Sequence, residues 1–118
     1  MPVRPLIASA TALTVTVGVV AAFAVSGSQA ATTKIVKVDD FEFSPSSVTV
    51  RRNTTVKWVW VGRAEHDVES IRKPRGARNF ASDVMSKGSY SRKFTKAGTY
   101  RIDCSIHASV MKMTVRVK

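Results

Sequence analysis

The sequence predicts an all-β fold, a sandwich of short strands preceded by an apolar N-terminal segment. Three observations favour this class. Beyond residue 31, apolar residues alternate with polar ones at a period of two, the alternating runs are short, and turn-forming residues separate them. A chain of 118 residues allows one such domain together with a small appendage.

The alternating runs give the expected strands in order. They cover residues 35–38, 48–51, 56–60, 90–94, 100–104 and 111–117. Turn signals lie between the runs at Ser44-Pro45-Ser46, Arg52-Asn53-Thr54, Lys87-Gly88 and Ala97-Gly98. The stretch 77–86 shows no clear period, so we expect a loop or one helical turn there.

The first 30 residues predict a secretory signal peptide. A short positive start, Met1 to Arg4, precedes a nearly continuous apolar or small run from Leu6 to Val25, and small residues lead to a cleavage site after Ala30. The apolar run is nearly long enough to span a bilayer, so retention as a membrane anchor is the alternative. We therefore expect residues 31–118 to form an extracytoplasmic domain that is secreted, periplasmic or associated with the cell envelope.

The chain is strongly basic, with 19 Lys and Arg against 8 Asp and Glu. Most cations alternate with apolar residues in the expected strands, which indicates a solvated outer face. The cluster from Arg72 to Arg78 contains proline and glycine, so it is expected to be a loop, either simply solvated or a docking site for an acidic partner. Nucleic-acid binding is not expected, because no aromatic residues are interleaved with the basic run.

Cys104 is the only cysteine, so the domain cannot form an internal disulfide. An unpaired thiol is a liability in an oxidising compartment unless a metal holds it. His107 and Met111 follow three and seven residues later, and His66, the only other histidine, lies 38 residues upstream. Two imidazoles, one thiolate and a weak axial thioether are the ligand set of blue-copper electron-transfer sites.

The phase of the strands brings these side chains to one end of the sandwich. Cys104 lies on the inward face at the end of one expected strand, and Met111 lies on the inward face at the start of the last. If these strands are neighbours, the loop between them carries His107 to the same end. His66 follows the strand that ends near Val61, so all four candidates can meet at one pole.

Each candidate also has an ordinary structural interpretation, since a lone buried cysteine is usually a small hydrophobe. Two catalytic interpretations are poorly supported. Glu65 and Asp67 flank His66, but no nucleophile with an orienting partner accompanies them. Cys104 and His107 lie three residues apart on a short loop, which suits shared metal ligation better than a nucleophile–base pair. We therefore expect a protein that is not an enzyme.

Several short motifs follow one another in a characteristic order. They are Phe41-Glu42-Phe43-Ser44-Pro45, Val48-Thr49-Val50, Val56-Lys57-Trp58, His66-Asp67-Val68, Gly88-Ser89-Tyr90-Ser91, the run from Phe94 to Tyr100, Cys104-Ser105-Ile106-His107, and Met111. In order and spacing they resemble the cupredoxins, the small blue-copper family of plastocyanin, amicyanin and pseudoazurin. The resemblance covers residues 35–118, and the short Cys-x-x-His loop is most similar to the amicyanin-like group.

The resemblance implies a Greek-key β-sandwich that carries one copper ion between Cu(I) and Cu(II). By this similarity His66 and His107 would bind copper through imidazole nitrogen, Cys104 as thiolate and Met111 as the distant axial ligand, with His107 the more exposed. We expect a monomer that exchanges electrons with redox partner proteins. The alternatives are an extracytoplasmic copper-binding or trafficking module and a cupredoxin-fold interaction domain that binds no metal.

Three features depart from the family pattern. The gap between His107 and Met111 differs by one residue from that of amicyanin and plastocyanin, so Met113 stays an alternative axial ligand, although strand register favours Met111. Asp67 stands where the family usually has asparagine. We expect its carboxylate to accept hydrogen bonds from the Cys104–Ser105 segment and its charge to lower the reduction potential. The loop 108–110 is less apolar than the docking surface common in the family.

Overall fold

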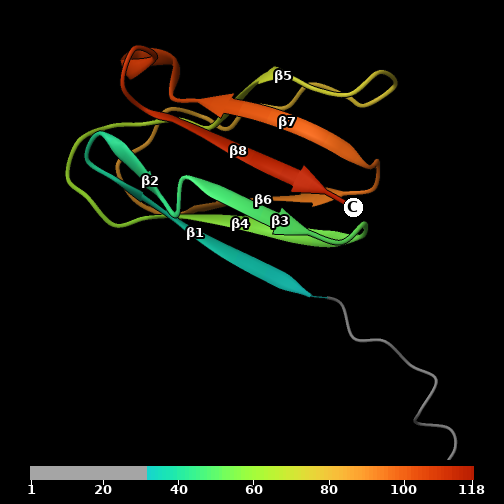
Figure 1. Cartoon of the computed structure of the whole chain (residues 1–118). Coiled ribbons are helices and arrows are strands. Elements are labelled where there is room, and N and C mark those ends of the chain that lie inside the picture. The colour runs from blue at the N-terminus through green and yellow to red at the C-terminus, as the bar shows by residue number, and fades with distance from the viewer. Residues whose placement is uncertain (1–31) are drawn as a thin grey trace, which may run out of the picture. The chain divides into compact units, whose positions relative to one another are not determined.

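The structure, a computed structural model, describes residues 32–118 and consists there of two four-stranded sheets that enclose one core (Figure 1). The strand order is β2-β1-β4-β6 in one sheet and β3-β8-β7-β5 in the other. In chain order the strands are β1 Thr33–Asp39, β2 Glu42–Ser44, β3 Ser47–Val50, β4 Thr54–Trp60, β5 Glu69–Arg72, β6 Ser89–Phe94, β7 Gly98–Asp103 and β8 Lys112–Val117. The predicted all-β sandwich is confirmed.

The predicted signal peptide or anchor at residues 1–30 lies outside the described residues. Between residues 32 and 118 no helix has the length and apolar character needed to cross a membrane.

Both sheets are mixed. β1 runs parallel to β4 and β3 runs parallel to β8, whereas the other neighbouring strands are antiparallel. The connection from β2 to β3 carries the chain from one sheet to the other. β7 and β8 are antiparallel neighbours, which is the condition that the sequence argument required for the ends of the two strands to meet.

Burial alternates along the strands as the sequence predicts. In β4 the inward residues Val56, Trp58 and Trp60 are buried, and in β3 Val48 and Val50 are buried. Along β7, β8 and the residues that adjoin them, the inward set is also buried: Tyr100, Ile102, Cys104, Met111, Met113, Val115 and Val117. These side chains form the contact between the sheets, because apolar area removed from water favours the packed state by about 25 cal/mol per Å².

Three segments differ from the expectation. β2 was not predicted, because it has only three residues and lies between two expected strands, next to the turn signal at Ser44-Pro45-Ser46. β5 was not predicted, because its four residues show no clear alternation and Ile71 is exposed. Residues 77–86 contain no helical turn, so that alternative was wrong. The segment runs extended beside residues 66–70, where the Ser82 N–H donates to the Val68 carbonyl at 2.8 Å and the Ser70 N–H donates to the Phe80 carbonyl at 2.9 Å.

Phe80 explains why this segment is ordered without a strand pattern. Its side chain is buried, and its ring centroid lies 6.0 Å from that of Trp58 and 5.7 Å from that of Phe94. One aromatic side chain therefore anchors the loop to the core, while backbone hydrogen bonds tie it to the residues that follow β4.

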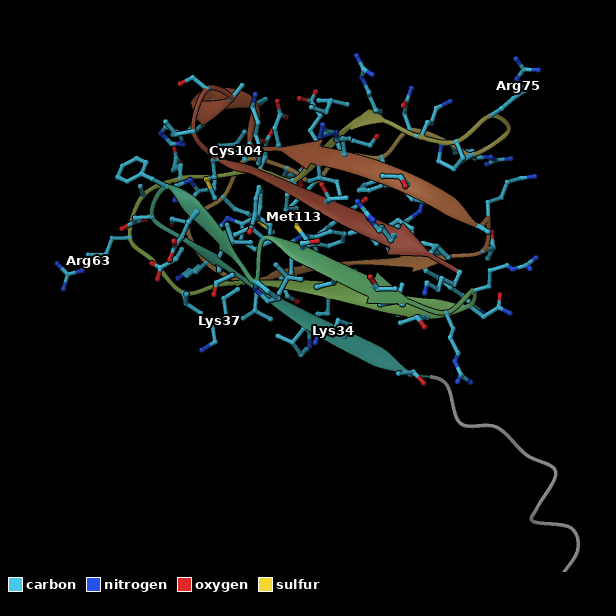
Figure 2. The ribbon with its side chains drawn as sticks, in the orientation of Figure 1. Lys34, Lys37, Arg63, Arg75, Cys104 and Met113 are labelled. Atoms are coloured by element: carbon cyan, nitrogen blue, oxygen red, sulfur yellow. The ribbon has the colours of Figure 1, made fainter. Side chains whose placement is uncertain are left out.

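The basic cluster occupies the end of β5 and the loop after it, as Arg72 is the last residue of β5. This loop packs beside the start of β7, because a Cβ on Gly98 would lie 2.7 Å from Pro74. Cys104 follows the other end of β7, roughly 20 Å away at about 3.3 Å per residue. Figure 2 accordingly shows Arg75 and Cys104 at opposite ends of the molecule.

Candidate metal centre

Three possible metal-donor atoms, one sulfur and two imidazole nitrogens, converge at the end of the sandwich beyond β7. The Cys104 Sγ lies 3.5 Å from the Nδ1 of His107 and 3.9 Å from the Nδ1 of His66. The two Nδ1 atoms are 3.2 Å apart. Cys104 and His66 are fully buried, whereas His107 is partly exposed. The structure therefore brings together three of the four predicted residues, with all donor atoms within 4.8 Å of one another.

The β7–β8 connection positions Cys104 and His107. Cys104 keeps the extended backbone of β7, and a short 3₁₀ turn, Ser105–His107, follows it. The His107 N–H donates to the Cys104 carbonyl at 3.0 Å, and side chains three residues apart in a 3₁₀ turn lie above one another. The spacing Cys-x-x-His thus places the sulfur and the imidazole on the same side of the turn.

Met111 closes this connection. Its N–H donates to the His107 carbonyl at 2.9 Å, and its carbonyl accepts from the Cys104 N–H at 3.0 Å. The Met111 side chain is fully buried directly before β8, in phase with the inward face of that strand as predicted. Met113 is also buried, but its sulfur accepts a hydrogen bond from the Trp58 indole N–H at 3.2 Å. Its side chain is therefore part of the core packing.

His66 is held through its backbone from two sides. Its N–H and carbonyl exchange hydrogen bonds with the carbonyl and N–H of Met85, both at 3.0 Å. The same carbonyl accepts a hydrogen bond from the Trp60 indole N–H at 3.1 Å. Trp60 is therefore a core residue that also anchors the segment carrying His66.

Asp67 joins the two parts of the site. Its carboxylate accepts hydrogen bonds from the backbone N–H and the hydroxyl of Ser105, both at 2.6 Å. Asp67 is 6% exposed, so its charge is largely removed from solvent. The prediction that Asp67 accepts hydrogen bonds from the Cys104–Ser105 segment is confirmed.

The surroundings of the Cys104 sulfur disfavour the thiolate form when no cation is bound. Burial raises the pKa of this thiol above its ordinary value, although backbone N–H groups of Asp67, Ile106 and His107 oppose the shift. A thiolate in this position therefore needs a compensating positive charge. A bound cation supplies that charge, and its binding releases the thiol proton.

Two residues that contact the histidines were not predicted as part of the site. Asp40 Oδ1 lies 3.0 Å from the His66 Nε2. The Phe41 ring is perpendicular to the His107 ring, with centroids 4.9 Å apart. Both residues belong to the turn between β1 and β2, and only the tertiary structure brings that turn to the site. In the sequence, Phe41 was noted only as the first residue of the motif Phe41-Glu42-Phe43-Ser44-Pro45, and no sequence feature pointed to Asp40.

Comparisons with known proteins give the family. Residues 30–118 match the family model described as "Copper binding proteins, plastocyanin/azurin family". The chain belongs to this family. It is 37% identical over 84 residues to a plastocyanin from Scenedesmus fuscus, a match that spans 64% of this chain and 86% of the plastocyanin.

Solved structures of the family agree with this assignment. An oxidised point mutant of amicyanin is 25% identical, with a TM-score of 0.65 over 73% of this chain and 82% of the amicyanin. Pseudoazurin from Methylobacterium extorquens AM1 is 26% identical, with a TM-score of 0.66 over 72% of this chain and 74% of the pseudoazurin. The resemblance to the cupredoxins is confirmed.

The donor set fits the copper that this family binds. Thiolate and imidazole donors suit copper in both oxidation states, and a buried thioether at the adjoining strand can supply a weak axial contact. The three donor atoms already face one another at 3.2–3.9 Å, so a small ion fits between them with little rearrangement. Copper as the cofactor of this cupredoxin is therefore consistent with its own side chains.

The Asp67 carboxylate should lower the reduction potential of the copper site. Its negative charge stabilises Cu(II) more than Cu(I) through the Ser105 contact. We expect Asp67→Asn to have a higher reduction potential than the wild type, as measured by voltammetry. Glu65→Gln, which removes an exposed neighbouring carboxylate, serves as the control. Equal potentials in wild type and Asp67→Asn would contradict the prediction.

Proposed function

We propose that this cupredoxin is an exported type 1 copper protein that carries single electrons between redox partners. His66, Cys104 and His107 serve as copper ligands, with Met111 as the axial ligand. The convergence of one sulfur and two imidazole nitrogens within 4.8 Å at one pole carries the proposal. Copper in such a site accepts and gives up one electron.

The surroundings of the donors suit an electron carrier. Backbone hydrogen bonds close the β7–β8 connection and fix His66 to Met85, so the ligand positions are set by the fold. Cys104 and His66 are buried, which hinders direct transfer of the ion to another protein and argues against the trafficking alternative. Of the three donors only His107 is partly exposed, so little of a bound metal ion would be open to a substrate, which favours a carrier over an enzyme.

His107 is the proposed exit for the electron, because it is the partly exposed histidine of the site. An apolar rim lies around it. Phe41 (53% exposed) packs against its ring, and Ile106 (51%) and Val110 (66%) belong to the same connection as His107. The loop 108–110 is less apolar than is common in the family. Phe41, from the β1–β2 turn, adds exposed apolar surface beside His107.

The visible spectrum tests the proposed function directly. We expect the copper-loaded, oxidised protein to show an intense blue or green thiolate band and a reversible one-electron wave, and Cys104→Ser to lose the band. The fold of Cys104→Ser is checked by urea unfolding. A colourless wild-type protein that binds only Cu(I) would favour the trafficking module, and a protein that takes up no metal would favour the interaction domain.

Two methionine variants separate the axial ligand from a core residue. Met111→Leu should shift the thiolate band and raise the reduction potential, because it removes a donor to Cu(II). Met113→Leu should leave both unchanged and destabilise the fold by about 1–3 kcal/mol, because the buried Trp58 indole N–H loses its acceptor. Spectra, voltammetry and urea unfolding of both variants check this assignment, and the reverse pattern would make Met113 the ligand.

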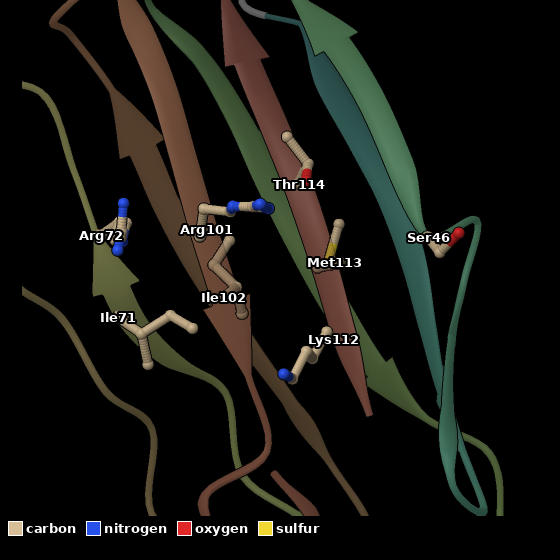
Figure 3. Close-up of a pocket in the computed structure, with 8 residues that line it drawn as sticks. All are labelled: Ser46, Ile71, Arg72, Arg101, Ile102, Lys112, Met113 and Thr114. Carbon is tan, nitrogen blue, oxygen red and sulfur yellow. The ribbon is translucent and has the colours of Figure 1, made fainter. Parts of the chain in front are cut away.

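The basic surface supports a partner with an acidic face. Among residues 32–118, no Lys or Arg nitrogen lies within 4.0 Å of a carboxylate oxygen, so none of these cations is neutralised by a salt bridge. Figure 3 shows Arg72, Arg101 and Lys112 around one open cavity on the outer side of β5, β7 and β8. Lys112 directly follows Met111, so this end of the surface is nearer the site than the loop 73–78 is.

Charge variants at the two ends test this docking surface. We expect Arg101→Gln with Lys112→Gln to slow oxidation of the reduced protein by ferricyanide several-fold at low ionic strength, because positive charge near the site attracts the anion. Arg75→Gln with Arg78→Gln removes the same charge from the far end and should have a smaller effect. If both double variants slow the oxidation equally, the net charge of the protein sets the rate and the position of the cations does not, which would contradict a docking surface near Lys112.

The location of the protein is proposed from its N-terminal sequence. The order of positive, apolar and small residues over 1–30 supports export, either with cleavage after Ala30 or with retention as an anchor. Residues 31–118 then form the copper domain, which we propose to be a monomer outside the cytoplasm.

A further inference from the structure

The side of His66 that faces away from Cys104 contacts a carboxylate. The Nε2 of His66 lies 3.0 Å from Asp40 Oδ1, while its Nδ1 faces Cys104 and His107. His66 is fully buried, and the Asp40 side chain is 32% exposed. The Asp40–His66 contact is the one pair of oppositely charged side-chain types within 4.0 Å in the part of the chain that the structure describes.

Asp40 is itself held in place by the loop after β4. The backbone N–H of Arg63 donates to both carboxylate oxygens at 3.0 Å, and that of Ala64 donates to Oδ1 at 2.8 Å. These backbone donors, followed by His66, lower the pKa of Asp40 to about 2. Independently of the pKa, both Asp40 oxygens already accept hydrogen bonds from backbone N–H groups, so the geometry makes this carboxylate an acceptor.

Gly62 makes room for this arrangement. A Cβ at position 62 would collide with the Asp40 carboxylate and would lie 2.8 Å from the Asp40 backbone nitrogen. Gly62 is not among the glycines with a positive φ, so the position requires glycine for space and not for backbone conformation. The loop 62–64 thus wraps closely around the Asp40 side chain.

Phe41 shows that the β1–β2 turn is held in an unfavourable conformation. Asp40 and Phe41 form its two central residues, between Asp39 and Glu42, which pair with each other. Phe41 has φ +70°, in the left-handed region that bulky residues rarely adopt. Such strain persists only where surrounding contacts over-determine the backbone. Here the contacts are those of Asp40 with His66 and of the Phe41 ring with both histidines.

We propose that Asp40 is a positioning residue of the copper site that fixes the tautomer of His66 and strengthens it as a ligand. This inference rests on the proposed function. Because Asp40 only accepts, the shared hydrogen belongs to His66 Nε2, and Nδ1 of the neutral ring keeps its lone pair toward Cys104. A carboxylate behind a metal-bound imidazole orients the ring and raises its basicity. The added negative charge stabilises Cu(II) more than Cu(I).

Asp40→Asn tests the proposal, because it keeps the shape and one acceptor oxygen but removes the charge. We expect the Cu(II) affinity to fall by about 10- to 100-fold and the Cu(I) affinity to fall less. Competition with chromophoric chelators for each oxidation state measures both losses. Each tenfold excess of the Cu(II) loss over the Cu(I) loss raises the reduction potential by about 59 mV, since one electron is transferred.

Gly62→Ala and Glu42→Gln are the matched controls. Gly62→Ala keeps the Asp40 charge but displaces the carboxylate, so it should also raise the potential. Glu42→Gln removes an exposed carboxylate two residues away that does not contact His66, and it should leave the potential unchanged. If Asp40 only braces the loop 62–64, its Asn variant will lose Cu(I) and Cu(II) affinity equally, with no change of potential, and the proposal is overturned.

A measurement on the copper-free protein separates this proposal from the proposed function. Ring ¹⁵N chemical shifts should show His66 with its proton on Nε2 in the wild type and a mixture of tautomers in Asp40→Ala. If the wild type binds no copper, the proposed function fails, and the tautomer alone then decides whether Asp40 positions His66. An unchanged tautomer in Asp40→Ala would overturn the inference whether or not copper binds.

Discussion

Closure of the β7–β8 connection is the constraint on which the rest of the site depends. The Met111 N–H donates to the His107 carbonyl and the Cys104 N–H donates to the Met111 carbonyl, which returns the chain to the sheet within a few residues. The 3₁₀ turn Ser105–His107 aligns the Cys104 sulfur with the His107 imidazole. The connection is this tight because β7 and β8 are antiparallel neighbours whose inward faces continue into Cys104 and Met111. Core packing of the two strands therefore also sets the spacing of the donor atoms.

His66 reaches the same pole by a different principle. It belongs to no strand, and the segment that carries it is fixed by Trp60, by Met85 and by Asp67, which bridges to Ser105. Two carboxylates contact the residues of the site: Asp67 accepts a hydrogen bond from Ser105 in the cysteine loop, and Asp40 contacts the His66 imidazole. In this net-basic protein, two carboxylates thus adjoin the place where a cation would bind.

Much of the fold was predictable because a half-buried strand leaves a period of two in the sequence. The inward sets of β3, β4, β7 and β8 followed from that period, and the donors followed from Cys104 being the only cysteine beside two histidines. β5 and the segment 77–86 could not be predicted. Their order comes from backbone hydrogen bonds and from the single anchor Phe80, which give no periodic signal.

The sequence by itself determined the strand phase, the loop that holds Cys104 and His107, and the choice of a metal over a disulfide for the lone thiol. Only the tertiary structure decided which residues surround the histidines. Asp40 lies 26 positions from His66 in the sequence, and Phe41 lies 66 positions from His107. Gly62, in the loop after β4, leaves room for the Asp40 carboxylate of the β1–β2 turn. Such contacts depend on the tertiary packing of the sheets and turns, and the local periodicity of the sequence contains no information about that packing.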